Sequence, residues 1–350
     1  MVRISEIHVV APHFKRRYSG VTSTIIQLVP KQAEIVGIAT LGPGLPNGLP
    51  KIAWWQMPLL LKRPRRRPLR VWHARRNNEM LMGLFLKSAF RAPLTLVFTS
   101  AAQRSHSWFS RFLISRMDTV IATSGPSGQT LAVPHTVVMH GVDCARFRPP
   151  VSPDDQWEHS GLSGRYAVGC FGRIRYLKGT DLFVDAMVRL LPDYPDWTAV
   201  LAGRVTRQNR GFYETLLRRI AGTGLERRIV ILGELSDADL WYRRLTLHVS
   251  PSRYEGFGLT PLEAMASQTA VVASDAGSYP EMIVDGVTGA VVSAGNGDAL
   301  VEAIRRYMAD PELAAAHGRN GREHVCENFP VEKEMSGINA VYDRIWRESK

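Results

Sequence analysis

The chain has 350 residues, of which 45% are hydrophobic, and this is enough for two α/β domains with separate cores. No stretch approaches the roughly 18–20 consecutive apolar residues of a membrane span, and we expect no secretory signal. The cysteines, Cys144, Cys170 and Cys326, are too widely spaced for a disulfide framework or a zinc pattern. We therefore expect a cytoplasmic protein without a metal site.

Positive charge is concentrated in the first half of the chain. Residues 1–150 carry 21 Lys and Arg against 5 Asp and Glu, a net +16, whereas residues 151–350 carry 23 against 27, a net −4. The densest run, 62–70, holds six cations in nine positions. Such a run is typical of segments that bind nucleic acid or an anionic membrane surface, although a solvated loop remains open. The membrane-surface candidates are Lys62, Arg63, Arg65, Arg66, Arg67 and Arg70.

Short apolar runs alternate with helical segments, which favours parallel sheets in an α/β protein. The strands expected in the first half are Glu6–Ala11, Glu34–Ile38, Leu69–Trp72, Leu94–Thr99, Thr119–Ala122 and Thr136–Met139. Those expected after the proline-rich run 149–153 are Tyr166–Phe171, Thr198–Ala202, Ile229–Leu232, Leu245–Val249 and Ala270–Ser274. We expect two doubly wound domains, residues 1–152 and 164–328, with ligands at the carboxyl ends of the strands. An amphipathic helix, Val331–Trp346, is predicted in the last segment, 329–350.

A glycine-hinged turn follows the strand predicted at 245–249. Gly256 and Gly258 permit a tight bend that brings the backbone close to a ligand. Thr260 is placed as an N-cap, and Pro261 suits the first position of a helix. The unpaired N–H groups of that helix would face the loop, where a phosphate is favoured.

Two carboxylates flank this turn. Glu255 lies beside the glycines and has no capping role, so it is a candidate ligand-binding group. Glu263 fits two interpretations: a capping box with Thr260, or a contact to the same ligand.

A second loop carries cations. In Phe171-Gly-Arg-Ile-Arg-Tyr-Leu-Lys-Gly-Thr-Asp181, Gly172 lets the chain turn at the end of a predicted strand. Arg173 and Lys178 then lie at the mouth of that strand. Two such cations are suited to neutralising a diphosphate.

These two elements, in this order, resemble the Gly-Arg…Lys-Gly and Glu-x7-Glu signatures of the retaining glycosyl transferases group 1. The resemblance implies the GT-B fold: two doubly wound, Rossmann-like domains facing a cleft, with a C-terminal helix that crosses back to the N-terminal domain. It also implies that Glu255 holds hydroxyls of the donor sugar and Glu263 the ribose diol. Arg173 and Lys178 would hold the diphosphate.

Further matches extend the resemblance along the chain. His140-Gly-Val-Asp143 looks like the family's Asn-Gly-Val-Asp turn, and the run 275–289 follows the usual C-terminal order. The implied donor-binding residues are Gly20, Gly172, Arg173, Lys178, Gly203, Arg204, Gly233, Glu234, Glu255, Gly256, Gly258, Leu259, Thr260 and Glu263. Arg173, Lys178 and Glu255 are the implied catalytic residues.

The acceptor side is less well defined by the sequence. His73 follows a predicted strand and leads into Arg75 and Arg76, so all three are candidate acceptor-binding residues, although a structural histidine fits His73 equally. Many relatives have an active-site histidine where this chain has Thr99-Ser100. No general base is therefore assigned.

The resemblance looks closest, in 16–21 and 71–77, to mannosyltransferases of the lipopolysaccharide inner core. It implies metal-independent transfer of mannose from GDP-mannose, with no cofactor, to a 3-deoxy-octulosonate (Kdo) residue of a lipid A-linked acceptor. The expected partners are a nucleotide sugar, an anionic glycolipid and the anionic cytoplasmic face of a bacterial inner membrane, but not nucleic acid.

Several alternatives remain open. They are a different nucleotide sugar or glycolipid acceptor, a nucleotide-sugar epimerase of the same fold, and a nucleic-acid-binding protein. A phosphorylase would share the fold, but the sequence lacks the lysine context that pyridoxal binding needs. The last would explain the basic run at 62–70 but not the pair of glutamates.

Overall fold

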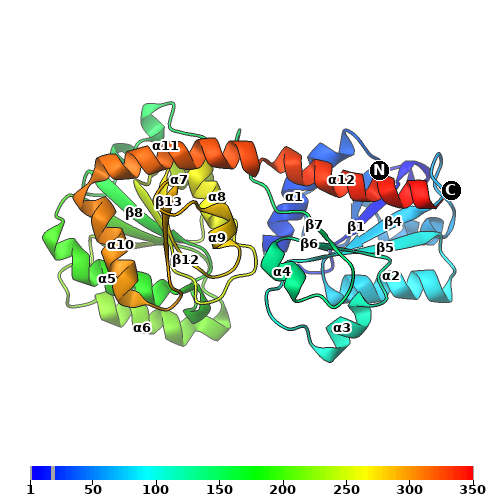
Figure 1. The fold of residues 1–350 in the computed structure, drawn as a ribbon, viewed down its shortest axis with the longest axis horizontal. Coiled ribbons are helices and arrows are strands. Elements are labelled where there is room, and N and C mark those ends of the chain that lie inside the picture. The colour runs from blue at the N-terminus through cyan, green and yellow to red at the C-terminus, as the bar shows by residue number, and fades with distance from the viewer. Residues whose placement is uncertain (1, 17–19, 350) are drawn as a thin grey trace. The chain divides into compact units, whose positions relative to one another are not determined.

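The structure, a computed structural model, describes residues 2–16 and 20–349. The described residues form two compact units (Figure 1). The first comprises residues 2–141, apart from 17–19, together with 331–349, and the second is Val142–Pro330. No helix in the described ranges is long and apolar enough to cross a membrane.

Within the described residues, the first unit is built on a seven-stranded parallel sheet of order β3-β2-β1-β4-β5-β6-β7. The strands are β1 (Val9–Pro12), β2 (Ile38–Leu41), β3 (Lys51–Ile52), β4 (Arg70–Ala74), β5 (Leu94–Ser100), β6 (Thr119–Ala122) and β7 (Thr136–Val137). The helices are α1 (Gly20–Ala33), α2 (Asn77–Ala89), α3 (Trp108–Ile114), α4 (Gly125–Gln129) and α12 (Val331–Glu348), with a 3-10 helix at Trp54–Leu61.

Alternation along the strands gives this sheet two apolar faces. Val9 and Val71 point to a cluster that includes α1 and α12, whereas Val10 and Trp72 point to the opposite cluster. The second cluster also contains Leu60 of the 3-10 helix and buried residues of α2 and α3. Successive strand residues face opposite sides, so nearly continuous apolar runs are what a sheet covered on both faces requires.

Helix α12 is the last in the chain, yet it belongs to the first unit and packs beside α1 (Figure 1). Its apolar stripe includes Ile338, Val341 and Tyr342. This confirms the C-terminal helix that crosses back to the first domain. The Tyr342 hydroxyl lies 2.6 Å from Nδ1 of His73, whose Nε2 lies 2.6 Å from the Thr99 hydroxyl.

Arg70 was expected on the surface and that prediction is wrong. Its side chain is buried, and its guanidinium donates to the carbonyls of Ile7, Leu60 and Ile4, each at 2.9 Å, and to that of Lys62. Burial lowers the pKa of Arg70 to about 10. The last cation of the basic run therefore joins the N-terminal segment to the 3-10 helix instead of facing solvent.

In the described residues of the second unit, a six-stranded parallel sheet has the order β10-β9-β8-β11-β12-β13. The strands are β8 (Tyr166–Phe171), β9 (Trp197–Ala202), β10 (Ile229–Gly233), β11 (Leu247–Ser250), β12 (Ala270–Ser274) and β13 (Gly289–Val292). The helices are α5 (Thr180–Leu190), α6 (Arg210–Ile220), α7 (Ala238–Arg244), α8 (Thr260–Ala266), α9 (Tyr279–Met282), α10 (Gly297–Ala309) and α11 (Pro311–Asn328). The strand order reverses between β8 and β11, and such a switch point is where doubly wound sheets bind ligands.

The proline-rich run at 149–153 belongs to the second unit, and the first unit ends earlier, at Gly141. Val142 pairs with Pro330 in an isolated bridge. Asp155, just after the run, forms an ion pair with Arg243 at 2.7 Å. The bridge marks where the second unit begins and ends, and the ion pair ties the end of the run to that unit.

The contact between His73 and Tyr342 yields a stability prediction. Burial, with the nearby charge of Arg75, holds the pKa of His73 well below its usual range, so the ring is neutral and needs both partners. We expect Tyr342→Phe to lower the free energy of unfolding by about 1–3 kcal/mol, because a buried ring nitrogen loses its partner. Urea denaturation measures this. The control is Tyr213→Phe, because Tyr213 is half-buried and its hydroxyl has no partner in the described chain; equal losses in both variants would contradict the prediction.

Candidate active site

Two loops of the second unit meet at the carboxyl edge of its sheet. One follows β8 and contains Lys178; the other follows β11 and contains Glu255. The two side chains form an ion pair and are 17% and 12% exposed. Because β8 and β11 are the neighbours at which the strand order reverses, the pair lies at the expected ligand site.

A second ion pair holds the two loops together. Arg253 donates to both carboxylate oxygens of Asp181 at 2.7 Å each, and its guanidinium lies 3.9 Å from the ring centroid of Tyr176. The backbone N–H groups of Arg253 and Tyr254 also donate to the Leu177 carbonyl, at 3.0 and 3.2 Å. A bidentate arginine–carboxylate pair fixes geometry as well as adding energy, so the loops are ordered before a ligand arrives.

Glu255 is held in its charged form. Burial alone would raise its pKa, but the Lys178 ammonium and the hydrogen bonds from Gly256 and Tyr279 outweigh burial and lower that pKa. The Gly256 N–H lies 3.0 Å from Oε1, and the Tyr279 hydroxyl 3.2 Å from Oε2. Tyr279 opens α9 and was not predicted as a site residue, since nothing in its local pattern connects it to Glu255.

Glu263 has a different environment. The capping box expected with Thr260 is not formed: the helix is capped at Leu259, without a side-chain hydrogen bond. The Tyr242 hydroxyl instead donates to Oε2 of Glu263 at 2.9 Å. Burial raises the pKa of Glu263, although the hydrogen bond from Tyr242 opposes that rise. A partly exposed carboxylate with spare acceptor capacity suits a ligand that brings hydroxyl donors.

Glycines let the loops approach closely. A Cβ on Gly203, at φ 149°, would lie 1.7 Å from the Gly172 carbonyl oxygen, so the loops after β8 and β9 touch through backbone alone. A Cβ on Gly179, at φ 66°, would lie 1.9 Å from the Pro251 carbonyl oxygen. No other residue type fits at either position without moving the backbone.

Three cations share the loop after β8. Arg173 is exposed and has no partner among the described residues. Arg175 is half-buried, and its Nε is buried without a partner in that same part of the chain. Burial, together with the charge of Arg173, lowers the pKa of Arg175. Lys178 pairs with Glu255, whereas Arg173 and Arg175 have no acidic partner among the described residues, so this loop carries excess positive charge. Arg175 was missed from the sequence because the resemblance assigns no role to it.

The remaining expected donor residues lie at several positions. Those of the second unit lie at the ends of β8, β9 and β10, or between β11 and the start of α8: Gly172, Gly203, Arg204, Gly233, Glu234, Gly256, Gly258, Leu259 and Thr260. The Thr260 hydroxyl lies 3.1 Å from that of Ser250. Gly20 is the first residue of α1 in the first unit. Residues 17–19 of the run 16–21 lie outside the described residues.

The expected acceptor residues are in the first unit. His73 is fully buried with both ring nitrogens engaged, which favours the structural interpretation that the sequence left open. Arg76 lies 3.0 Å from Oε1 of the buried Glu79 and 2.9 Å from Nδ1 of His13. The Arg75 N–H donates to the other Glu79 oxygen at 2.7 Å. The structure therefore brings Arg75, Arg76 and Glu79 together at the end of β4, with His73 behind them.

The Lys178–Glu255 pair makes a testable prediction. We expect Lys178→Met to lower the free energy of unfolding by about 3 kcal/mol, because it leaves a buried carboxylate unpaired. Adding Glu255→Gln should restore most of that loss. The matched control is Lys87→Met, which breaks the half-exposed Lys87–Asp118 pair and should cost less than about 1 kcal/mol. Guanidinium denaturation of the wild type, both single variants at 178 and 255, the double variant and the control measures this, and strictly additive losses at 178 and 255 would refute the coupling.

Comparisons with known proteins agree with this geometry. Residues 153–324 match the family described as glycosyl transferases group 1. The chain is 57% identical over its whole length to all of the lipopolysaccharide core biosynthesis mannosyltransferase LpcC of Rhizobium leguminosarum bv. viciae. It is 49% identical, over 99% of its length, to all of the corresponding mannosyltransferase LpsB of Rhizobium meliloti.

Among solved structures, the chain resembles the Anabaena protein HepE in complex with UDP and glucose. The TM-score is 0.80 at 20% identity, covering 96% of this chain and 99% of that one, a likeness of fold alone. Together with two parallel sheets and the switch-point pair of Lys178 and Glu255, these similarities place the chain among the group 1 glycosyltransferases of the GT-B fold.

Proposed function

We propose that this glycosyltransferase is a mannosyltransferase of the lipopolysaccharide core, which moves mannose from GDP-mannose, with retention, to a Kdo residue of a lipid A-linked acceptor. The observation that carries the proposal is the meeting of Lys178 and Glu255 at the switch point of the second sheet. The full-length similarity to two core mannosyltransferases supports the sugar and the pathway. The net +16 of residues 1–150 suits an acceptor that carries phosphates and carboxylates.

The site residues divide the work on the donor. When the diphosphate binds, Lys178 turns from Glu255 to a phosphate oxygen, and Arg173 and Arg175 add two further cations. These fixed charges stabilise the negative charge that develops on the leaving diphosphate, so transfer needs neither a metal ion nor a cofactor. Glu255, released from Lys178 and held by Gly256 and Tyr279, accepts hydrogen bonds from the sugar hydroxyls and orients the sugar. Glu263 accepts from the ribose diol.

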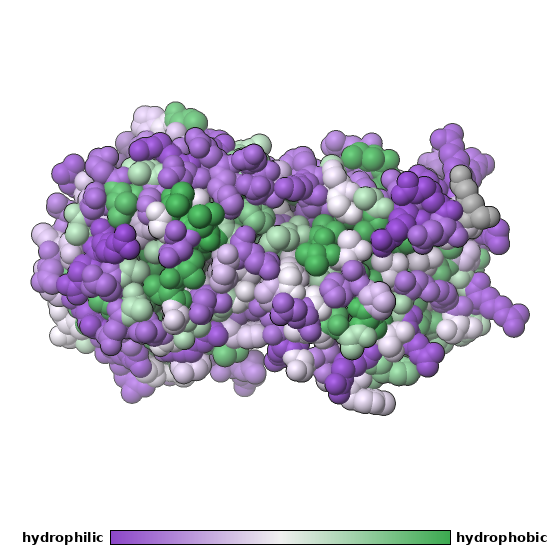
Figure 2. All heavy atoms as spheres, in the orientation of Figure 1, coloured by the Kyte–Doolittle hydropathy of each residue, from purple (hydrophilic) through white to green (hydrophobic). Residues whose placement is uncertain are grey.

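We propose that the protein meets its lipid-linked acceptor at a membrane surface. The 3-10 helix, α2 and α3 cover the same face of the first sheet and leave large apolar side chains exposed. We call these the aromatic face: Trp54, Trp55, Leu59, Leu81, Phe85, Phe90, Trp108, Phe109 and Phe112. Figure 2 shows apolar side chains among polar ones over α2 and α3. Trp108 is 74% exposed, and Arg116 lies 5.4 Å from the Phe112 ring. Exposed aromatic side chains beside arginines are typical of a protein surface that rests on a membrane interface.

Donor identity is tested by nucleotide binding and product analysis. We expect GDP to stabilise the protein by about 2.7 kcal/mol at a hundredfold excess over its Kd, and UDP or ADP to do so far less.

The variant Glu263→Gln should lose this stabilisation by GDP. Its free energy of unfolding without nucleotide should not fall, since the variant removes a charge whose desolvation is costly. GDP-mannose with a Kdo–lipid A acceptor should then give a mannosylated product by mass spectrometry. Stronger stabilisation by another nucleotide would contradict GDP-mannose as the donor. Stronger stabilisation by an oligonucleotide would favour the nucleic-acid-binding alternative.

The role of Arg173 is tested by kinetics. We expect Arg173→Ala to lower kcat/KM by about 2–4 kcal/mol of transition-state stabilisation without loss of stability, because the side chain is exposed and has no partner in the described residues. The control is Arg227→Ala, which should leave kcat/KM unchanged, because Arg227 is exposed and lies just before β10, at the opposite edge of the sheet. An unchanged kcat/KM for Arg173→Ala would show that Arg173 does not bind the diphosphate.

The membrane surface is tested by vesicle binding. We expect Phe85→Ser and Trp108→Ser together to weaken binding to anionic vesicles by at least about tenfold, because each removes a large apolar side chain from the interface. The effect should persist in high salt, which screens the basic run but not apolar contact. Leu217→Ser, exposed on α6 of the second unit, is the matched control. Equal binding by all three proteins would contradict docking through the aromatic face.

A further inference from the structure

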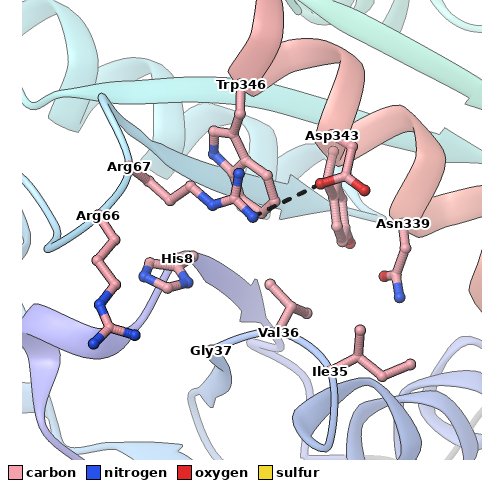
Figure 3. A pocket seen from close by; sticks show the side chains of 10 residues that line it. His8, Ile35, Val36, Gly37, Arg66, Arg67, Asn339, Asp343 and Trp346 are labelled. Atoms are coloured by element: carbon pink, nitrogen blue, oxygen red, sulfur yellow. Dashed lines mark ion pairs between the residues drawn. The ribbon is translucent and has the colours of Figure 1, made fainter.

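The first unit contains a cavity of about 450 Å³ at the edge of the sheet opposite to the carboxyl ends (Figure 3). His8 immediately precedes β1 and Gly37 immediately precedes β2, so one wall lies at the amino ends of these strands. Helix α12 forms another wall. The lining residues are His8, Ile35, Val36, Gly37, Arg66, Arg67, Asn339, Tyr342, Asp343 and Trp346.

Two arginines of the basic run line this cavity in different ways. The Arg67 guanidinium lies 4.1 Å from the ring centroid of Trp346 and 3.8 Å from Asp343, so it is positioned while most of its donors stay available (Figure 3). Arg66 is exposed and has no ion-pair or hydrogen-bond partner in the described parts of the chain. Its backbone has φ 63°, a left-handed conformation that is costly for an arginine. A strained backbone conformation persists only where the surrounding structure fixes it. Here the conformation places the unpaired guanidinium of Arg66 beside His8.

The cavity is positively charged and offers donors. Burial lowers the pKa of His8, and the charges of Arg67, Arg70 and Arg66 lower it further, which indicates positive potential at the ring. His8 is tied to the Arg65 carbonyl at 3.0 Å through Nε2. Asn339 accepts from Gln32 at 2.9 Å through Oδ1, so its orientation is fixed and its amide donors face the cavity (Figure 3). Asp343 is the only carboxylate among the lining residues, and its side chain is 57% exposed.

The cavity also has an apolar side. Ile35, which is 66% exposed, and Val36 lie opposite the arginines across the empty space in Figure 3. A ligand that fits carries a compact anion for the arginines and an apolar portion for these side chains. Guanidinium groups bind phosphate oxygens in pairs, and a phosphomonoester presents the most charge in the least volume.

We propose that this cavity binds the terminal phosphomonoester of an anionic membrane lipid, at a site separate from the donor site of the second unit. The inference rests on the proposed location at a membrane surface, but not on the identity of the sugar or of the acceptor. It assigns different tasks within the basic run: Arg66 and Arg67 recognise one headgroup, whereas Lys62 and Arg63 contribute only general attraction.

The test compares vesicles of phosphatidylcholine that contain phosphatidic acid with vesicles that contain oleate at equal surface charge. Co-sedimentation is measured for the wild type, for Arg66→Gln/Arg67→Gln, and for the control Lys62→Gln/Arg63→Gln, which removes the same charge from exposed side chains outside the cavity. A fourth variant, Ile35→Glu, puts a carboxylate on the cavity wall and removes no cation.

We expect the wild type to prefer phosphatidic acid over oleate by about tenfold, because the arginines donate charge-assisted hydrogen bonds to phosphate. Arg66→Gln/Arg67→Gln and Ile35→Glu should both abolish this preference, and the control should keep it. Equal effects of the two double variants, or no preference in the wild type, would overturn the proposal.

Inorganic phosphate distinguishes the source of the ligand. We expect it to release the protein from phosphatidic acid only at concentrations far above that of the lipid. Release at equal phosphate concentration would mean a soluble phosphate compound and would overturn the lipid assignment. Mannose transfer to an acyl-free Kdo acceptor, measured on the same variants, should be unchanged. Sedimentation needs no sugar donor, so it tests the lipid site alone. The transfer assay tests the proposed transferase, and either proposal can therefore fail without the other.

Discussion

The ion pair between Lys178 and Glu255 joins two loops whose residues are 77 positions apart, and the arrangement of the second sheet makes that possible. Parallel strands end at one edge, so the loop after β8 and the loop after β11 come together only because these strands are neighbours. A buried pair of this kind contributes little net stability, since desolvation offsets attraction. Its consequence is that both side chains stay in place at the site, with Glu255 held in its charged form, until a ligand offers each a better partner.

The surroundings of the pair decide which ligand that can be. Arg253 and Asp181 neutralise one another beside the site, whereas Arg173 and Arg175 have no acidic partner in the described chain. The loop thus carries positive charge that the protein itself does not balance, and a diphosphate supplies the missing charge. Glu263 is prepared differently: its raised pKa shows that charging this carboxylate is costly in the free protein, so hydroxyl donors from a ligand would relieve that cost.

Much of the fold could be predicted from local pattern, and the failures have identifiable causes. The bounds of β6, β8 and β12 agree with the sequence, since each is a buried apolar run with clear flanking breaks. β1 and β2 begin later than expected, because a 3-10 turn occupies Ile4–Glu6 and α1 continues to Ala33. Two strands were missed: β3 has two residues, and β13 starts at a glycine in a stretch that looks like a loop. The site motifs were found because their spacing is local to a single loop, whereas Arg70, Tyr242 and Tyr279 take their roles from contacts across the fold.

The first unit shows how a single run of cations can be divided by the fold. Arg70 enters the interior and bonds four carbonyls, Arg67 lies against Trp346, and Arg66 is left without a partner in the described chain. Lys62 and Arg63 remain exposed. The run alone fits nucleic acid, a membrane or solvent equally well, because its composition is the same in each case. The three interpretations differ in which cations are already engaged. Arg66 is not engaged, and it lines a cavity with an apolar wall, which favours an amphiphilic anion over the uniform phosphate backbone of a nucleic acid.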